Sequence, residues 1–496
     1  MNDKSSYKHI LKSTSLFGSV QVVQVLSTII KGKFVAILLG TVGMGISSLL
    51  VSSIAMLQTI SGLGLNFSAV REISQAQESG DSEKLSRTII ISKRWLFISA
   101  ILGGVSLIII SPFLSKYVFG NYEYTWHFIF LSLVVVLTTL GIGYQTLLQG
   151  TRRLKDIAKS SAFGSVLSIF TSIPFYYIWG VKGIVPALIV AALTTFSLNY
   201  FYANRIKLTK VNITIKETAK EGTDMVKLGV VMMITNLIGV LTTFIIIAYI
   251  KRNGSLSDVG LYQGGISLTT QYVGLIFSAM VVDYFPRLSA INTDKIKVRE
   301  LANQQSEVML LIVTPLLITL IIVSPLIIRL LLSHAFIPID NFIRGISIGL
   351  FFQAASHSMA LISFAKGDRK TFLTLSIIGN GLLILTSILG YKFFGLDGIS
   401  SLFIIQAISC FVIVYLTAYK KYNYWMSKSF TMIFVLGIIM ISIVYLLVVF
   451  TPSQYGYSFS VVFLCISVFY SIRKLNKLIG LQELYNNFIK KYYKKQ

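Results

Sequence analysis

The feature that most constrains this chain is a succession of long apolar runs separated by short polar loops. Roughly 20 apolar residues in a row are enough for a helix to cross a bilayer. Inside a bilayer each backbone N–H and C=O must be bonded within the protein, so a lone apolar run of this kind folds as a helix. The residues are 54% hydrophobic and 13% charged, whereas a soluble domain carries about 25% charged residues. The sequence therefore predicts an all-α polytopic membrane protein.

About 14 membrane-spanning helices are expected. Their approximate ranges are 13–39, 45–70, 93–113, 126–149, 157–178, 184–203, 225–250, 258–283, 305–330, 342–364, 371–393, 397–419, 430–450 and 457–472. The first run continues without a small-residue cleavage site, which favours a retained helix over a cleaved signal peptide. The second and eighth runs are rich in Gly, Ser and Thr, residues that are common where membrane helices pack closely.

Basic residues alternate between the two sides of the predicted membrane. The net charge is +25, with 44 Lys and Arg against 19 Asp and Glu. Most of the basic residues lie on the N-terminal segment and on every second loop after it, which marks the cytoplasmic side. Both termini are therefore expected in the cytoplasm. Because these basic residues set topology, nucleic acid is not an expected partner.

The remaining composition argues against an enzyme. The loops on the opposite side are short, and even the longest of them, around KYVFGNYEYTW, is too small to form a catalytic domain. The only cysteines, Cys410 and Cys465, lie inside apolar runs, which argues against a disulfide framework or a metal site. No catalytic residue, metal ligand or cofactor is expected.

The two halves of the chain carry related segments. LLQGTRRLKDIAKSSAFGSVLSIFTSI is matched in the second half by ISFAKGDRKTFLTLSIIGNGLLILTSI, and WGVKGI is matched by FGLDGI. Each repeat holds an even number of spans, so the two should share one orientation about a pseudo-two-fold axis along the membrane normal. We expect a six-helix lobe over 1–208, a cytoplasmic linker over 209–224, a second six-helix lobe over 225–420, two extra transmembrane helices over 429–472 and a basic amphipathic cytoplasmic tail over 473–496.

Several glycine-rich segments carry a resemblance to a known family. They are LLGTVGMGI (Leu38–Ile46), SGLGLNFSAVREIS (Ser61–Ser74), VGLYQ (Val259–Gln263), YFPRLS (Tyr284–Ser289) and the LLQG and FAKGDR turns. Together they resemble the Wzx-type flippases, also called O-antigen translocases or polysaccharide biosynthesis proteins, of the multidrug/oligosaccharidyl-lipid/polysaccharide (MOP) exporter superfamily. The resemblance covers nearly the whole chain.

The resemblance implies both an architecture and a function. It implies two six-helix lobes around a central cavity, and alternating-access transport without an ATP-binding domain. The implied cargo is an undecaprenyl-pyrophosphate-linked oligosaccharide, an O-antigen or related repeat unit, moved from the cytoplasmic to the outer leaflet of the bacterial inner membrane. The lipid bilayer is the implied surroundings, and a polysaccharide polymerase and a chain-length regulator are candidate partners.

Two lysines interrupt the first apolar run. Lys31 and Lys33 point about 200° apart on an α-helix, so they cannot line one cavity face. Lys31 continues a polar stripe that begins at Gln21 and Gln24, whereas Lys33 shares its side with apolar residues. We predict that Lys31, Gln21 and Gln24 line the substrate cavity and that Lys31 faces the lipid pyrophosphate or its sugars. Snorkelling to the interface is the alternative for Lys31 and is favoured for Lys33.

Further polar residues inside the spans are candidates for the same cavity, because polar groups at membrane depth are often functional. The substrate-binding candidates are Asn66, Asn236, Gln271, Gln353 and His357. Helix packing through interhelical hydrogen bonds is the alternative for each. Arg71 and Arg287 lie at predicted cytoplasmic helix ends, where they could contact the pyrophosphate, form a gate or simply set topology.

The placement of acids bears on the cargo. No Asp or Glu lies in the middle of any predicted span of the first half. A cationic drug or a carboxylate-built Na⁺ site would need such a group, whereas a lysine suits an anionic cargo. A drug/cation antiporter, a lipid II-type flippase and, less favoured, a membrane polysaccharide polymerase or glycosyltransferase remain the alternatives.

Overall fold

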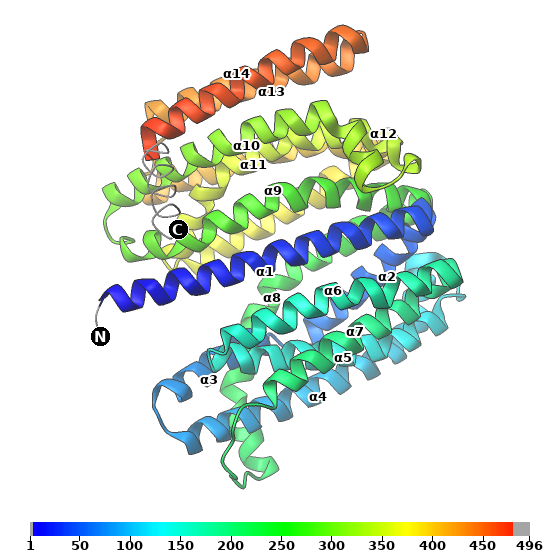
Figure 1. Cartoon of the computed structure of the whole chain (residues 1–496), viewed down its shortest axis with the longest axis vertical. Coiled ribbons are helices and arrows are strands. Elements are labelled where there is room, and N and C mark those ends of the chain that lie inside the picture. Colours follow the sequence, from blue (N-terminus) through cyan, green and yellow to red (C-terminus); the bar gives the residue numbers. More distant parts are fainter. Residues whose placement is uncertain (1–2, 480–496) are drawn as a thin grey trace, which may run out of the picture. The chain divides into compact units, whose positions relative to one another are not determined.

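Helices make up nearly all of the structure (Figure 1). The computed structural model describes the backbone of residues 3–479. It does not describe the side chains of 3–19, 270–272, 275, 278, 279, 281–283, 453, 454 and 479. The helices are α1 (Asp3–Leu38), α2 (Gly40–Ser61), α3 (Leu65–Glu78), α4 (Ser82–Leu114), α5 (Thr125–Gly150), α6 (Leu154–Trp179), α7 (Ile184–Ala203), α8 (Ile215–Asn253), α9 (Leu256–Ala290), α10 (Lys295–Leu331), α11 (Asp340–Ala365), α12 (Arg369–Tyr422), α13 (Lys428–Phe450) and α14 (Ser453–Ile479).

The predicted all-α polytopic fold is confirmed. Among the described residues, 11 helical segments are long and apolar enough to cross a membrane. Two of these segments hold two expected spans each: Leu154–Ala203 contains α6 and α7, and Arg369–Tyr422 is α12. The expected tail over 473–496 lies outside the described residues from 480 onwards, and its described part continues α14.

The helix α12 is a hairpin of two spans. Its backbone leaves the helical region at Gly395, where φ is 64° and ψ is −144°. Glycine reaches such angles readily because it has no Cβ. A Cβ on Gly390 would come within 2.4 Å of the Gly398 carbonyl oxygen, so the two arms touch closely beside the turn. The expected spans 371–393 and 397–419 correspond to these arms.

The second expected span, 45–70, needs correction. The helix α2 ends at Ser61, and α3 begins at Leu65. Between them Leu63 and Gly64 both have positive φ, 50° and 62°, which ends the regular helix. Asn66 therefore lies in the first turn of α3 and not inside α2.

The chain forms two compact units. Unit 1 comprises Met1–Gln263 and Leu331–Ala335, and unit 2 comprises Gly264–Leu330 and Phe336–Gln496. Packing therefore groups α8 with the preceding helices, whereas the sequence repeat assigns 225–420 to the second lobe. The two divisions differ because one rests on spatial contacts and the other on sequence similarity.

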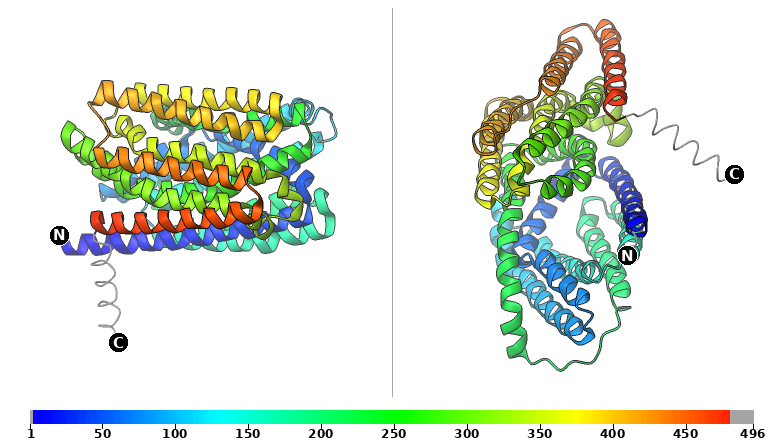
Figure 2. Two further views of the ribbon diagram at one scale, coloured as in Figure 1. Left: turned by 90° about the horizontal axis from the view of Figure 1, so that it is seen from above. Right: turned by 90° about the vertical axis from the view of Figure 1, so that its left-hand side faces the viewer.

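Most helices of unit 1 run side by side, and the long helix α8 (green) runs across them in the right-hand view of Figure 2. In unit 1, α4 packs on α5, α5 on α7, α6 on α7 and α1, and α2 on α8. A buried apolar cluster joins α3, α4, α5 and α8 through Leu65, Ile73, Ile89, Leu147 and Met225. The segment between α7 and α8 crosses one end of the unit, as the right-hand view of Figure 2 shows.

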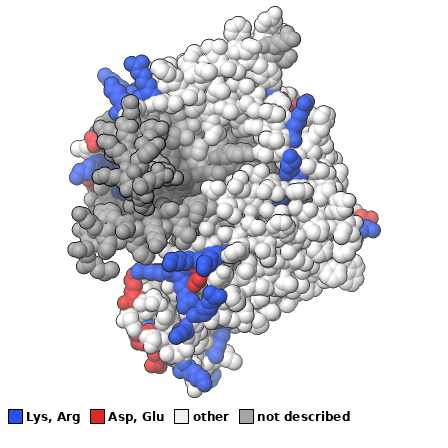
Figure 3. Space-filling model, viewed as in Figure 1, with Lys and Arg blue, Asp and Glu red and all other residues white. Residues whose placement is uncertain are grey.

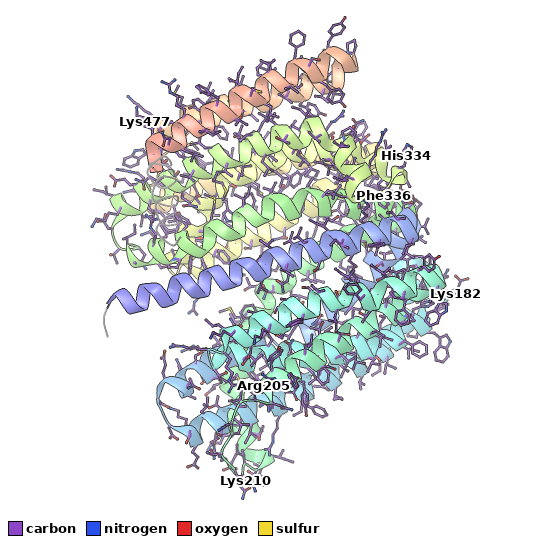
Figure 4. The ribbon with its side chains drawn as sticks, in the orientation of Figure 1. Lys182, Arg205, Lys210, His334, Phe336 and Lys477 are labelled. Atoms are coloured by element: carbon purple, nitrogen blue, oxygen red, sulfur yellow. The ribbon has the colours of Figure 1, made fainter. Side chains whose placement is uncertain are left out.

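The charges of unit 1 gather at the ends of its helices. We call the end that holds residues 79–82, 151–153 and 204–214 the basic end. Arg205 and Lys210 lie there, and Lys182 lies at the opposite end (Figure 4). Blue basic atoms cluster over the basic end in Figure 3, whereas the flank beside it is almost uncharged. An apolar flank between polar ends is typical of a surface in contact with lipid.

Unit 2 secures its last helices through a buried carboxylate. Glu307 of α10 is 5% exposed and accepts hydrogen bonds from the hydroxyls of Ser427 (2.8 Å) and Ser429 (3.0 Å). The Ser427 hydroxyl also caps α13 by accepting from the Phe430 N–H (2.9 Å). A buried charge is tolerated when it is hydrogen-bonded in this way, so Glu307 positions the start of α13.

Candidate functional site

A cavity of about 530 Å³ lies within unit 1. It is bounded by the end of α2, the break between α2 and α3, and parts of α4, α5 and α8. Its volume falls in the usual range of small-molecule sites, about 300–1,000 Å³. The cavity is therefore large enough to take one or two sugar-sized groups.

The break between α2 and α3 shapes this cavity. A Cβ on Gly64 would lie only 1.9 Å from the Gly229 carbonyl oxygen of α8, and a Cβ on Gly229 would lie 2.3 Å from the Leu63 carbonyl oxygen. Only glycine allows the break and α8 to approach this closely. The contact places Asn66, just after the break, on the same cavity as Asn236 of α8.

Three amide side chains on this cavity are free to bind a ligand. Gln58, Asn66 and Asn236 all line it. Among the described residues, none of these three side-chain amides has a hydrogen-bond partner. Each amide offers donors and acceptors, so together they could bind the hydroxyls of a sugar.

Hydroxyl groups complete the polar lining. Thr59 and Thr243 line the cavity, and each donates to a carbonyl of its own helix, that of Ala55 (2.7 Å) and that of Gly239 (3.2 Å). Their oxygens still have lone pairs available as acceptors. Thr139 of α5 is 4% exposed, and its hydroxyl has no partner within the described part of the chain. A buried unsatisfied hydroxyl beside a cavity is a reason to expect a polar occupant.

A second cavity of about 440 Å³ continues the first along α2 and α8. The two share Ala55, Val240 and Thr243 in their linings. The second cavity adds Ser47, Ser48, Ser52 and Gln263 to the polar lining. From Ser47 to Thr59 the polar side of α2 extends for about 18 Å at 1.5 Å per residue. This length is more than half of the roughly 30 Å hydrocarbon core of a bilayer.

The lining of both cavities is electrically neutral. All of the described residues that border them are uncharged. Neutral amides and hydroxyls bind neutral polar groups and offer no counter-ion to a charged one. The cavity is therefore suited to the uncharged, hydroxyl-rich part of a ligand, and an ionic part would need a partner elsewhere.

The predicted residues of α1 do not border this cavity. Gln21 is exposed, whereas Gln24, Lys31 and Lys33 are half-buried on α1, which packs on α6. The helix is continuous through Gly32, so Lys31 and Lys33 keep the separation of about 200° expected from the sequence. Within the described part of the chain, Lys31 has no ion-pair partner.

The predicted residues of the second half lie in unit 2. His357 of α11 is stacked on the ring of Phe277, with centroids 4.9 Å apart. Its Nε2 atom is buried and has no hydrogen-bond partner among the described residues. Gln353, one turn earlier, is exposed. The side chain of Gln271 lies outside the described residues.

The two candidate gate arginines lie on the surface of their units. Arg71 is an exposed residue of α3, and Arg287 is an exposed residue in the last turn of α9. Neither of them borders the neutral cavity. Their assignment to pyrophosphate binding or gating stays a prediction.

Sequence reasoning did not single out some of the residues that border the cavity. Thr139 lies within the apolar run SLVVVLTTL and Thr243 within LTTFIII. A threonine in a membrane helix usually bonds to its own backbone, so nothing in the sequence favours these two as ligand-binding residues. Gly239 also borders the cavity, and a Cβ there would meet nothing within 4 Å.

Comparisons with known proteins agree with this architecture. Residues 76–341 match the polysaccharide biosynthesis protein family. The chain is 21% identical to the lipid III flippase of Escherichia coli (strain K12) over 362 residues, which cover 70% of this chain and 83% of the relative. The corresponding protein of Shigella flexneri matches to the same extent.

Solved structures show the same fold. The lipid II flippase MurJ in an inward closed conformation superposes with a TM-score of 0.71 and 12% identity, over 94% of this chain and 99% of MurJ. An inward-facing multidrug resistance transporter of the MATE family, from the MOP superfamily, gives a TM-score of 0.62 and 15% identity, over 81% of this chain and 94% of the transporter. At such identities the likeness concerns the fold alone.

Proposed function

The chain belongs to the polysaccharide biosynthesis protein family, and we propose that it is a flippase for a polyprenyl-pyrophosphate-linked oligosaccharide. In this proposal the sugars pass from the cytoplasmic to the outer leaflet of a bacterial inner membrane. The cargo is an O-antigen or a related surface-polysaccharide repeat unit. The fold shared with the MOP superfamily and the names of the relatives, flippases of lipid III and lipid II, support this class of function.

The observation that carries the proposal is the neutral cavity of unit 1. Gln58, Asn66 and Asn236 present free amides, and Thr139 presents a buried hydroxyl without a partner among the described residues. Sugar hydroxyls both donate and accept hydrogen bonds, so they match a lining of this kind. The cavity would hold the sugars while the polyprenyl chain remains in the bilayer.

The charge of the lining disfavours a cationic drug as cargo. A drug/cation antiporter of the same fold would need an acidic group near its cargo, because a buried cation requires a counter-charge. Gln58, Asn66, Asn236 and Thr243 are all uncharged. We therefore favour the flippase over the drug/cation antiporter. A lipid II-type flippase remains an alternative, because the lipid II flippase MurJ has the same fold.

The pyrophosphate needs cations outside the neutral cavity. Lys31 is the preferred candidate because it is half-buried and has no acidic partner among the described residues. Arg71, in the middle of α3, and Arg287, in the last turn of α9, are further candidates, and His357 is a candidate in unit 2. In this proposal the charged headgroup and the neutral sugars are bound by different parts of the protein.

Genetic complementation tests the substrate. Flippase-null strains that accumulate different lipid-linked glycans are transformed with the wild-type gene and with the variants Asn66→Ala and Asn236→Ala. The wild type should restore surface polysaccharide in at least one strain. Each alanine variant should reduce transport about fivefold, since a lost hydrogen bond to substrate is worth about 1 kcal/mol. Surface glycan is measured together with the amount of protein in the membrane.

A control on the same helix separates binding from folding. Asn253 lies at the end of α8, away from the cavity, and its amide donates to the Tyr249 carbonyl (3.0 Å). Asn253→Ala should keep transport at the wild-type level. If the wild type restores no strain despite good expression, or if purified protein changes the glycolipid covalently, the flippase proposal is wrong.

A further inference from the structure

A second region of unit 1 combines apolar walls with cations that have no acidic partner among the described residues. At the basic end, a cavity of about 710 Å³ lies between α4, α5, α7 and the first turn of α8. We propose that this cavity, lined on α4 by Lys93 and Phe97, is a binding site for an anionic phospholipid. The phosphate would contact Lys93, and the first part of an acyl chain would lie along the apolar walls.

The walls of the cavity are suited to an acyl chain. Leu96, Leu140, Leu147 and Phe196 contribute apolar surface to it. Phe97 is also part of the lining and is 57% exposed on the outside of α4. The exposed Phe97 therefore gives the cavity an apolar rim that an acyl chain could contact.

The cations of the cavity have no acidic partner among the described residues. Lys93 Nζ lies 5.7 Å from the centre of the Tyr144 ring. Arg94 donates to neutral groups, the Ile213 carbonyl (2.8 Å) and the Thr218 hydroxyl (2.7 Å). These contacts leave the positive charge of Lys93 and Arg94 uncompensated, and a phosphate would supply the missing negative charge.

An arginine earlier on the same helix shows the contrast. Arg87 donates to Glu221 (2.8 Å) and is also paired with Glu217 at 3.2 Å. Glu217 and Glu221, in the first turns of α8, therefore neutralise Arg87. Arg87 lies nearer the N-terminal end of α4 than Lys93 does. Lys93 lies about 9 Å deeper along α4, at 1.5 Å per residue. Lys93 therefore lies beyond the acids of α8 that neutralise Arg87.

A phospholipid fits this cavity better than the transported glycolipid or a soluble anion. Leu96 borders both this cavity and the neutral one, and it is 5% exposed. Lys93 lines only this cavity, and the free amides Asn66 and Asn236 line only the neutral one. A soluble anion would leave the apolar walls unused, whereas basic pockets between membrane helices on the cytoplasmic side suit anionic lipids.

A bound lipid would also join two helices. Ile215 and Thr218, in the first turn of α8, line the cavity together with Lys93. Trp95 of α4 donates to the Thr218 carbonyl (3.0 Å), and a Cβ on Gly222 would collide with the Trp95 indole at 2.0 Å. The lipid would thus contact both sides of this junction, and we expect it to stabilise the folded protein.

Native mass spectrometry and thermal unfolding test the proposal. Detergent-purified, delipidated protein is titrated separately with phosphatidylglycerol, phosphatidylcholine, glycerol 3-phosphate and a polyprenyl phosphate. Phosphatidylglycerol should bind in one tight step and raise the unfolding temperature. The other three should bind at least tenfold more weakly at this site. These measurements do not depend on transport, so their failure can be told apart from failure of the proposed function.

Variants assign the binding to this cavity. Lys93→Gln should weaken the tight step for phosphatidylglycerol at least tenfold, and Lys93→Arg should retain it. Lys159→Gln, at an exposed lysine near the start of α6, should leave it unchanged. If Lys93→Gln does not fold, a salt titration of the wild type replaces it, and added salt should weaken binding of phosphatidylglycerol. Equal binding of phosphatidylcholine, tighter binding of polyprenyl phosphate, or equal loss in Lys159→Gln would overturn the proposal.

Discussion

Single residues of α1 show how helical geometry separates two similar side chains. Lys31 and Lys33 are both half-buried, and the helix is unbroken between them. Lys31 lies on the side of α1 that holds the buried Ser27 and Val35, whereas Lys33 shares its side with the exposed Leu26. The two lysines therefore have different surroundings although only one residue separates them.

The two lysines should respond differently to substitution. Lys31→Ala should lower transport by tenfold or more, because it removes the preferred cation for the pyrophosphate. Lys33→Ala should change transport less than twofold, because its side chain extends from the apolar side and can snorkel. Surface glycan in a complemented strain measures both. Equal losses at matched expression would contradict the role assigned to Lys31.

A glycine on the cavity wall allows the cavity to be filled without disturbing the fold. Gly239→Leu should block transport by at least tenfold, since the new side chain enters the space between Asn236 and Thr243. The unfolding temperature should stay the same or rise, because glycine in a helix is about 1 kcal/mol worse than alanine. Gly381→Leu, at an equally open position of α12, should leave transport intact. Transport by a folded Gly239→Leu protein at the wild-type rate would show that the cargo does not use this cavity.

Whole elements depend on hydrogen-bonded turns at their ends. The two arms of α12 meet at Asp368, just before the helix. Its carboxylate accepts from the Thr371 N–H (3.0 Å) and hydroxyl (2.7 Å) and from the Tyr422 hydroxyl at the far end of the second arm (2.9 Å). Lys421 Nζ lies 3.7 Å away. Asp368 thus both caps the first arm and holds the second arm beside it.

The stability provided by this carboxylate should depend on pH. Hydrogen bonds from the N–H and hydroxyl of Thr371, followed by that of Tyr422, hold the pKa of Asp368 at about 2, below its ordinary 3.8. Because the folded-state pKa is lowered, the stabilisation is complete above about pH 4 and is lost as the pH falls through 2. Asp368→Asn should lower the unfolding temperature at pH 7 by about 1–3 °C. The difference in unfolding temperature between Asp368→Asn and the wild type should disappear as the pH approaches 2.

A surface aspartate provides the comparison for that experiment. Asp224 on α8 is 90% exposed on its side chain and lies 3.5 Å from Lys227 of its own helix. The difference in unfolding temperature between Asp224→Asn and the wild type should not change with pH, because exposed ion pairs contribute little to stability. A gap for Asp368→Asn that stays constant from pH 7 to pH 2 would rule out the proposed titration.

At the scale of the whole molecule, the topology rests on the distribution of charge. The basic end of unit 1 carries the cluster around Arg205 and Lys210, whereas Lys182 lies at the opposite end (Figure 4). The positive-inside rule predicts that the basic end faces the cytoplasm. This orientation also underlies the direction of transport in the proposed function.

Cysteine labelling tests this orientation directly. Cys410 and Cys465 are replaced by serine, and single cysteines are introduced as Lys182→Cys and Lys210→Cys, both exposed positions of unit 1. A membrane-impermeant maleimide should label Lys182→Cys in intact cells. It should label Lys210→Cys only after the membrane is permeabilised. The reverse pattern would invert the predicted topology.

The sequence by itself determined the all-α polytopic fold and its expected spans, together with the predicted cytoplasmic side. It could do so because backbone satisfaction in lipid and charge asymmetry are properties of each segment alone. Only the tertiary structure decided which polar residues share a cavity. Asn66, Asn236 and Thr139 line one cavity because the backbone breaks at Gly64 and packs there against Gly229. This contact joins residues that are far apart in sequence. Helical phase shows which side of a helix is polar, but packing between helices decides what that side faces.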